Sequence, residues 1–130
     1  DKDFGSVWEG KVLSASEDTG LGIVDFGSGQ IEVASGNIPE GARVRFKIPA
    51  LDVVLSTEKT PTVARNIFEG TLTDAVVHDY FADVLLDISG TPLWARITKK
   101  SYMDIGKKEG DTLYATVKSV VASSQFYIMP

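Results

Sequence analysis

The repeat that decides the fold is Ile67-Phe68-Glu69-Gly70-Thr71-Leu72-Thr73, which reads like Val7-Trp8-Glu9-Gly10-Lys11-Val12-Leu13 earlier in the chain. Each copy leads into an alternating pair of strands, at residues 22–34 in the first case and at residues 82–96 in the second. Similar segments that follow one another in the same order indicate a duplicated structural unit. We therefore expect a tandem repeat, with residues 1–60 as the first copy and residues 61–130 as the second.

Within each copy, apolar residues mostly recur at every second position in short runs. Val44, Phe46 and Ile48, for example, alternate with charged residues, and this period predicts short, half-buried strands. Turns are expected at Asp18-Thr19-Gly20, Gly27-Ser28-Gly29, Pro39-Glu40-Gly41, Ser89-Gly90 and Glu109-Gly110-Asp111. Many short strands with this spacing favour an all-β barrel or sandwich.

One short helix is expected, over residues 99–105 of the second copy. Thr98 is its expected N-cap, and Gly106 stands where a C-cap is expected. The first copy has only residues 35–38 in the corresponding place. Because a strand is expected to end at Ile97, the helix begins directly after it, and the N–H groups of its first turn have no partner within the helix.

Composition excludes several classes of protein. The chain has 130 residues, a net charge of −5 and no cysteine, so disulfides and zinc–thiolate sites are excluded. An acidic chain is a poor candidate for nucleic acid, and no apolar run is long enough to span a membrane. No Walker motif occurs, so this stretch is not expected to be an ATPase or other enzyme. The chain begins with Asp1 and without a signal-peptide pattern, so we expect it to be part of a longer protein.

Three short islands in the second copy carry cations, hydroxyls and backbone donors: Val63-Ala64-Arg65-Asn66, Ile97-Thr98-Lys99-Lys100-Ser101 and Val117-Lys118-Ser119-Val120. A small oxyanion needs several hydrogen-bond donors and positive charge in a small volume. Arg65 offers a rigid fork of donors, Lys118 a point charge, and the N–H of Ser119 lies beside it in sequence. Thr98 and Ser101 add hydroxyls on the first turn of a helix, whose N-terminus favours anions. These five residues form the candidate oxyanion site, with no metal and no catalytic residue.

Each of these residues also has a purely structural interpretation. Arg65 and Lys118 are, taken singly, solvated surface charges, and Thr98 and Ser101 are helix-capping residues. The basic stripe of Arg43, Arg45 and Lys47 is interpreted as an ordinary exposed strand face, because no aromatic residues alternate with it. His78, the only histidine, looks like part of a hairpin tip.

Taken together, the islands resemble a family. Val63-Ala64-Arg65-Asn66 followed by Ile67-Phe68-Glu69-Gly70 is similar to the opening Ser-x-Arg-Asn…Gly of molybdate-binding Mop (TOBE-type) domains. Leu93-Trp94-Ala95-Arg96-Ile97-Thr98-x-x-Ser101 and Tyr114-Ala115-Thr116-Val117-Lys118-Ser119-Val120 resemble its later signatures. The stretch from Arg43 to Leu55 is similar to the middle of the C-terminal regulatory region of molybdate ABC-transporter ATPase subunits. Val63 departs from the family pattern, which has Ser there, so that side-chain donor is absent.

The resemblance implies a pair of OB-like barrels of about five strands each, the di-Mop arrangement. It also implies a homodimer with strand exchange between copies and oxyanion sites at the protomer interface. The residues that carry over as ligand contacts are Arg65, Thr98, Ser101, Lys118 and Ser119. Molybdate and tungstate are both tetrahedral dianions of nearly equal size, so both stay open as the ligand, and no cofactor is expected.

In function, the resemblance implies a cytoplasmic regulatory domain attached to the ATPase domain of an ABC importer. It would lie at the membrane only through the transporter, reach the permease only indirectly, and inhibit import when internal molybdate or tungstate is plentiful. Two alternatives are a free-standing di-Mop protein that stores molybdate and a purely structural TOBE domain of another importer. Nucleic-acid binding on an OB-like surface is disfavoured by the acidity and by the lack of an aromatic row.

Overall fold

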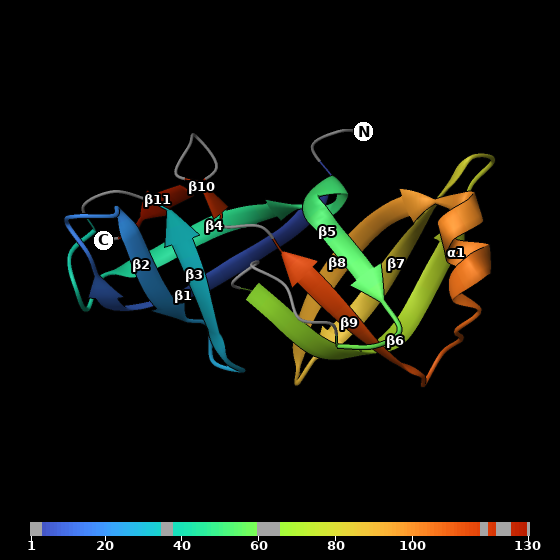
Figure 1. Cartoon of the computed structure of the whole chain (residues 1–130). Helices are drawn as coiled ribbons and strands as arrows, with labels where there is room; N and C mark the ends of the chain where they lie inside the picture. The colour runs from blue at the N-terminus through green and yellow to red at the C-terminus, as the bar shows by residue number, and fades with distance from the viewer. Residues whose placement is uncertain (1–3, 35–37, 60–65, 118–119, 122–125, 130) are drawn as a thin grey trace.

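The computed structural model describes residues 4–34, 38–59, 66–117, 120–121 and 126–129. Its strands form two sheets that lie side by side, with the only α-helix of the described residues at the outer end of the second sheet (Figure 1). The all-β prediction and the OB-like class are confirmed, since both sheets are strongly curled and nearly every element is a strand. None of the helices in the described part of the chain is long and apolar enough to cross a membrane.

The first sheet has six strands in the order β10-β3-β2-β1-β4-β11. Its members are β1 (Gly5–Ala15), β2 (Leu21–Asp25), β3 (Gln30–Ala34), β4 (Arg43–Pro49), β10 (Val120–Val121) and β11 (Phe126–Ile128). The second sheet has five strands in the order β5-β9-β6-β7-β8. Its members are β5 (Val53–Ser56), β6 (Asn66–Val77), β7 (Phe81–Ile88), β8 (Thr91–Thr98) and β9 (Thr112–Val117). A short 3-10 helix, η1 (Ala50–Asp52), precedes β5.

The last strand of each half crosses into the opposite sheet. β5 comes from the first half of the chain but pairs with β9, whereas β11 comes from the C-terminus but pairs with β4. The parallel strand β10 also joins β3 in the first sheet, which raises its strand number to six. The strand exchange implied by the family resemblance therefore occurs within this one chain. The division of the sequence into copies at residue 60 stays a prediction. It differs from the division into sheets, because each sheet contains strands from both sides of that residue.

The two halves share a detailed skeleton, which supports the repeat. The antiparallel register between β1 and β2 shifts between Val12 and Ser14, and that between β6 and β7 shifts between Leu72 and Asp74. At the first bulge, Val12 N–H donates to the carbonyl oxygen of Ala42 at 2.9 Å. At the second, Leu72 N–H donates to the carbonyl oxygen of Asp111, also at 2.9 Å. The same bulge and the same backbone bond thus occur in both copies, where they increase strand twist and help each sheet to curl.

The glycine of the Glu-Gly pair in each repeat is explained by a close approach of two strands. A Cβ atom at Gly70 would lie 2.7 Å from Ile88 Cδ1 and 3.2 Å from the Asp87 carbonyl oxygen. A Cβ atom at Gly10 would collide with the Asp25 carbonyl oxygen and with a methyl group of Val24. Only glycine leaves room for the neighbouring strand to cross so closely at these positions.

An aromatic cluster joins the two sheets into one core. Trp8 lies 4.4 Å from Phe26 and 5.7 Å from Phe68, measured between ring centroids. The buried Trp8 also donates its indole N–H to the Pro92 carbonyl oxygen of β8 at 2.8 Å. The expected alternation is confirmed on β4, where Val44, Phe46 and Ile48 are buried. The apolar faces of both repeats therefore form a single continuous core.

The glycine contacts generate a prediction about stability. Gly10→Ala should destabilise the fold by about 3 kcal/mol and Gly70→Ala by about 1 kcal/mol. The reason is that the added carbon at position 10 meets rigid backbone, whereas at position 70 it chiefly meets the flexible end of Ile88. Urea unfolding measures both, with Gly29→Ala as a control whose added carbon meets only the Phe26 ring. Equal losses for Gly10→Ala and Gly29→Ala would contradict this account.

Candidate functional site

The helix α1 (Lys99–Ile105) brings Thr98 and Ser101 together at its first turn. Thr98 is the N-cap, and its Oγ1 accepts a hydrogen bond from the Ser101 N–H at 3.0 Å. The same hydroxyl donates to Ser101 Oγ at 2.9 Å. At the other end, Gly106 is the C-cap, with a left-handed φ of 63°. The predicted helix and both of its predicted caps are confirmed.

This geometry defines which hydroxyl can serve an external anion. Thr98 uses its only hydroxyl proton on Ser101, so the proton left for a ligand is the one on Ser101. Both side chains are exposed, and the hydroxyls form a short chain in which each bond polarises the next. The Lys99 N–H is already used, because it donates to the Tyr80 carbonyl oxygen at 2.9 Å. Ser101 is therefore the outward hydroxyl donor of this turn.

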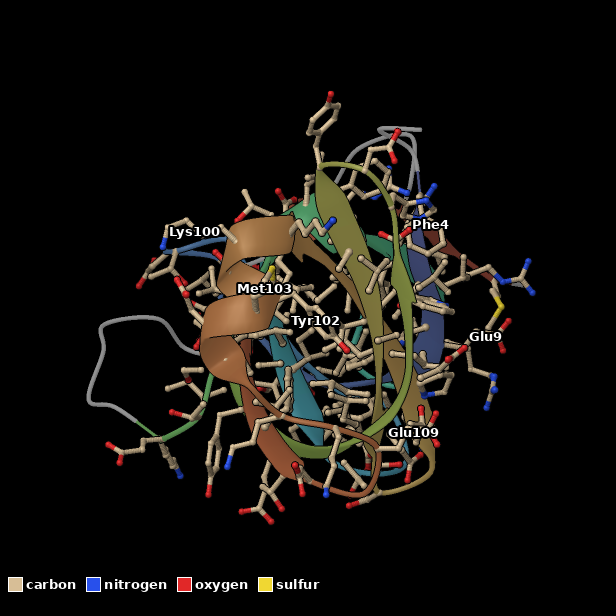
Figure 2. The ribbon with its side chains drawn as sticks, turned by 90° about the vertical axis from the view of Figure 1, so that its right-hand side faces the viewer. Phe4, Glu9, Lys100, Tyr102, Met103 and Glu109 are labelled. Atoms are coloured by element: carbon tan, nitrogen blue, oxygen red, sulfur yellow. The ribbon has the colours of Figure 1, made fainter. Side chains whose placement is uncertain are left out.

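A shallow pocket of about 510 Å³ lies beside this turn. Its lining residues come from the tip of the β6–β7 hairpin, from the end of β8 and from α1: Asp79, Tyr80, Thr98, Lys99, Lys100, Met103 and Asp104. Lys100 forms an ion pair with Asp104 at 2.8 Å and points away from the barrel, whereas Tyr102 points toward the core (Figure 2). The cation of Lys100 is thus already compensated by a carboxylate on the same helix.

The other three predicted site residues, Arg65, Lys118 and Ser119, lie outside the described residues. Their neighbours in the chain are described, however. The last pair of the β6–β9 ladder is Asn66 and Val117. Asn66 comes directly after Arg65 in the chain, and Val117 comes directly before Lys118. The structure therefore brings Thr98 and Ser101 together and leaves the placement of the other three as a prediction.

Asn66 is a residue whose role sequence reasoning missed. Its side chain is buried, with 3% of its surface exposed. The carboxamide oxygen accepts the Glu32 N–H at 2.8 Å, and the carboxamide nitrogen donates to the Glu32 carbonyl oxygen at 3.0 Å. The signal available in the sequence was an amide next to Arg65 at the start of an apolar strand, because a buried amide must find partners there.

A charged network supports the strand that leads into α1. The buried carboxylate of Asp83 on β7 accepts hydrogen bonds from Arg96 Nε at 2.7 Å and Nη2 at 3.0 Å. His78 Nε2 lies 3.1 Å from the same carboxylate, at the hairpin tip expected from the sequence. The Arg96 guanidinium lies over the rings of Phe81 and Phe4, at 4.4 Å and 4.9 Å from the centroids. Strand β8 is thereby held on β7 immediately before Thr98.

The network shifts the ionisation of its own members. The hydrogen bonds from Arg96 lower the pKa of Asp83 below its ordinary value, burial opposes this, and the hydrogen bond with His78 adds to the lowering. The hydrogen bond with Asp83 also raises the pKa of Arg96 above its ordinary value. Both groups are charged at neutral pH, so they form a fixed ion pair rather than a proton-transfer pair.

The first repeat has different chemistry at the corresponding positions. At the end of β4 it has Pro49, followed by Ala50, where the second repeat has Lys118 and Ser119 after β9. Ala50 is fully buried, and its N–H donates to the Phe4 carbonyl oxygen at 2.9 Å. Neither residue supplies charge or a hydroxyl. Among the described residues, no group of three or more His, Cys, Asp or Glu could hold a metal ion.

Comparison with known proteins places the islands in a recognised domain. Residues 62–121 match the TOBE domain. The chain is 35% identical over 118 residues to the molybdenum import ATP-binding protein ModC of Mesorhizobium japonicum, covering 89% of this chain and 32% of that protein. It is 31% identical over 122 residues to the ModC of Rhizobium etli, covering 92% of this chain and 34% of that protein. The chain thus spans about a third of the length of these relatives.

A solved structure has the same fold over nearly the whole chain. It is the cytoplasmic molybdate-binding protein ModG, in a form with molybdate bound. The TM-score is 0.77 at 23% sequence identity, and the match covers 94% of this chain and 93% of the other. The resemblance to TOBE-type domains of molybdate importer ATP-binding subunits, inferred from the islands, is confirmed.

The Asp83–Arg96 pair generates a prediction about acid stability. Because the folded-state pKa of Asp83 is lowered, its stabilising effect is present above about pH 4, the ordinary Asp pKa, and is lost as the pH falls through the lowered value. Asp83→Asn should cost about 2 kcal/mol of unfolding free energy near neutral pH and much less at strongly acidic pH. Urea unfolding across pH measures this, with the exposed Asp79→Asn as control. A loss independent of pH would contradict the assignment.

Proposed function

We propose that this chain, whose residues 62–121 match the TOBE domain, binds molybdate or tungstate and regulates an ABC importer. The observation that carries the proposal is the Thr98–Ser101 hydroxyl pair, which lies within the matched residues and leaves one outward donor on an exposed turn. The relatives named as molybdenum import ATP-binding proteins support the choice of anion and of transporter. The chain itself is proposed to be a non-enzymatic binding domain in the cytoplasm.

In the proposed site, the anion is held by five residues from the three islands. Arg65 and Lys118 supply the positive charge, Ser101 donates its hydroxyl proton, Thr98 orients and polarises that hydroxyl through its own hydrogen bond to Ser101, and Ser119 supplies its backbone N–H. A charge-assisted hydrogen bond contributes about 1.5–3 kcal/mol, so a few of them are enough for about micromolar affinity after the costs of binding. Val63 adds no donor where the family pattern has Ser.

Regulation is proposed to follow from differential binding. An anion shared by two protomers of a homodimer stabilises one dimer geometry over others, and the attached ATPase domains then experience a shifted equilibrium. The effect on transport is proposed to be inhibition when the internal anion is plentiful. The permease is reached only through the ATPase domains.

A second candidate function is storage of molybdate by a protein without a transporter. The observation that favours it is the match to ModG, which covers nearly all of this chain and nearly all of that one. ATP hydrolysis by the intact parent protein, measured with and without molybdate, separates the two candidates. Inhibition supports the regulator, whereas anion binding without any effect on a transporter supports storage. A structural TOBE domain, suggested by Val63, predicts no anion binding at all.

Anion binding should be visible as a thermal shift. Molybdate or tungstate at about 100 times its Kd should stabilise the fold by about 2.7 kcal/mol, which is several degrees for a domain of this size. Sulfate at the same ionic strength is the control, because it carries the same charge on a smaller anion. No shift with molybdate or tungstate, in a sample shown to be dimeric, would refute the proposed function.

Single substitutions should then locate the site. Arg65→Ala, Lys118→Ala and Ser101→Ala should each weaken molybdate binding by about tenfold or more, the equivalent of one charge-assisted bond. Ser101→Ala keeps the helix cap, because Thr98 still accepts the backbone N–H of residue 101. Ser101→Thr retains a hydroxyl and is the matched control in calorimetry. Parent-like binding by both Arg65→Ala and Lys118→Ala would show that the site assignment is wrong.

A further inference from the structure

Asn66 fastens the start of the ligand-bearing repeat to the opposite sheet. Its carboxamide accepts from and donates to the backbone of one residue, Glu32 on β3, at 2.8 Å and 3.0 Å. The Asn66 carboxamide thus bonds the backbone of β3 at Glu32, directly before the two residues, Val33 and Ala34, that pair with β10. One accepted and one donated hydrogen bond together fix both the position and the orientation of the buried amide, whereas a single bond would leave it free to rotate. The backbone of β6 therefore begins at a defined point on the first sheet.

The partner strand is held at the same place by another element of the first repeat. Val117 on β9 pairs with Asn66 of β6 on one side and with Val53 of β5 on the other. β3 and β5 both come from the first half of the chain. The described residues that adjoin Arg65 and Lys118 in sequence are thus fixed by the repeat that carries no candidate ligand residue of its own.

The equivalent junction in the first repeat is built differently. There Ser6 at the start of β1 accepts a hydrogen bond from the Trp94 N–H of β8 at 2.8 Å. Ser6 follows Gly5, not an arginine. Both residues join a strand of one sheet to the backbone of the other sheet, but the two-point contact occurs where a candidate ligand residue precedes it.

We propose that Asn66 is a positioning residue of the oxyanion site, and that the first repeat serves as the scaffold of that site through β3 and β5. The inference rests on the proposed function. Asn66 would not touch the anion but would act through Arg65, by fixing the backbone from which that long side chain extends. Fixing the backbone in advance lowers the cost of ordering the guanidinium when the anion binds. The retention of a repeat without its own ligand residues then has a physical reason.

The test compares Asn66→Ala with a substitution that removes other contacts between the same two sheets. Ser28 is the matched control, because its hydroxyl bonds Thr91 Oγ1 at 2.7 Å and the Ser89 carbonyl oxygen at 3.0 Å across the junction. Molybdate affinity by calorimetry and the unfolding midpoint are measured for both variants. Asn66→Ala should weaken binding by about tenfold, the size seen for outer-shell partners of ligand residues. Ser28→Ala should change affinity by less than about twofold, although it also removes contacts between the two sheets.

A double-mutant cycle separates positioning from general loosening. In the Arg65→Ala background, Asn66→Ala should cost much less affinity than in the parent, because the residue through which it acts is gone. An unchanged cost in that background, or an equal affinity loss in Ser28→Ala, would overturn the inference.

Failure of the proposed function is recognised separately. If the parent chain binds no molybdate or tungstate, the proposed function is refuted and the inference falls with it. If the parent binds but Asn66→Ala binds equally well, only the inference is overturned. Amide exchange without ligand shows whether the contact itself was removed: Asn66→Ala should speed exchange at Glu32 and Val117 more than Ser28→Ala does. Faster exchange with unchanged affinity also counts against the inference.

Discussion

The reciprocal exchange of final strands is the constraint on which the rest of this structure depends. β5 leaves the first half to pair with β9, and β11 returns from the C-terminus to pair with β4. Each sheet is therefore completed by the other half, and the outer sides of β4 and β9, which would otherwise be exposed edges, are covered from within the chain. The aromatic contacts of Trp8 with Phe26 and Phe68 then bury one core between the sheets. Neither repeat has its full set of strands without the other.

Within this shared frame, the repeats have diverged in chemistry but not in backbone. The bulges after Val12 and Leu72 and the glycines at 10 and 70 keep the same strand path in both. The ends of the strands differ, since Pro49 and Ala50 in the first repeat stand in the place of Lys118 and Ser119. The backbone requirements apply to both copies because both must curl, whereas only one copy keeps the charges and hydroxyls of a candidate site.

The parts of the fold that sequence reasoning predicted were those governed by local rules. The alternation around Val44, Phe46 and Ile48, and the caps Thr98 and Gly106, depend on neighbours a few residues away, and all were confirmed. The candidate site was predicted less completely. Thr98 and Ser101 do come together, but the sequence did not show that the Thr98 hydroxyl donates its hydrogen bond to Ser101. It also gave no account of Asn66, whose partner Glu32 lies in the other repeat.

The sequence by itself determined the strand period, the short helix and the resemblance to TOBE-type domains, because each depends on residue types at short spacing. Only the tertiary structure decided which sheet each final strand joins and which backbone a buried side chain meets. These outcomes depend on pairing between residues far apart in the chain, where strands with similar alternation offer several partners and local propensity does not choose among them. The choice is made by closure of the common core, which buries Trp8 and Phe68 together and places Asn66 against β3.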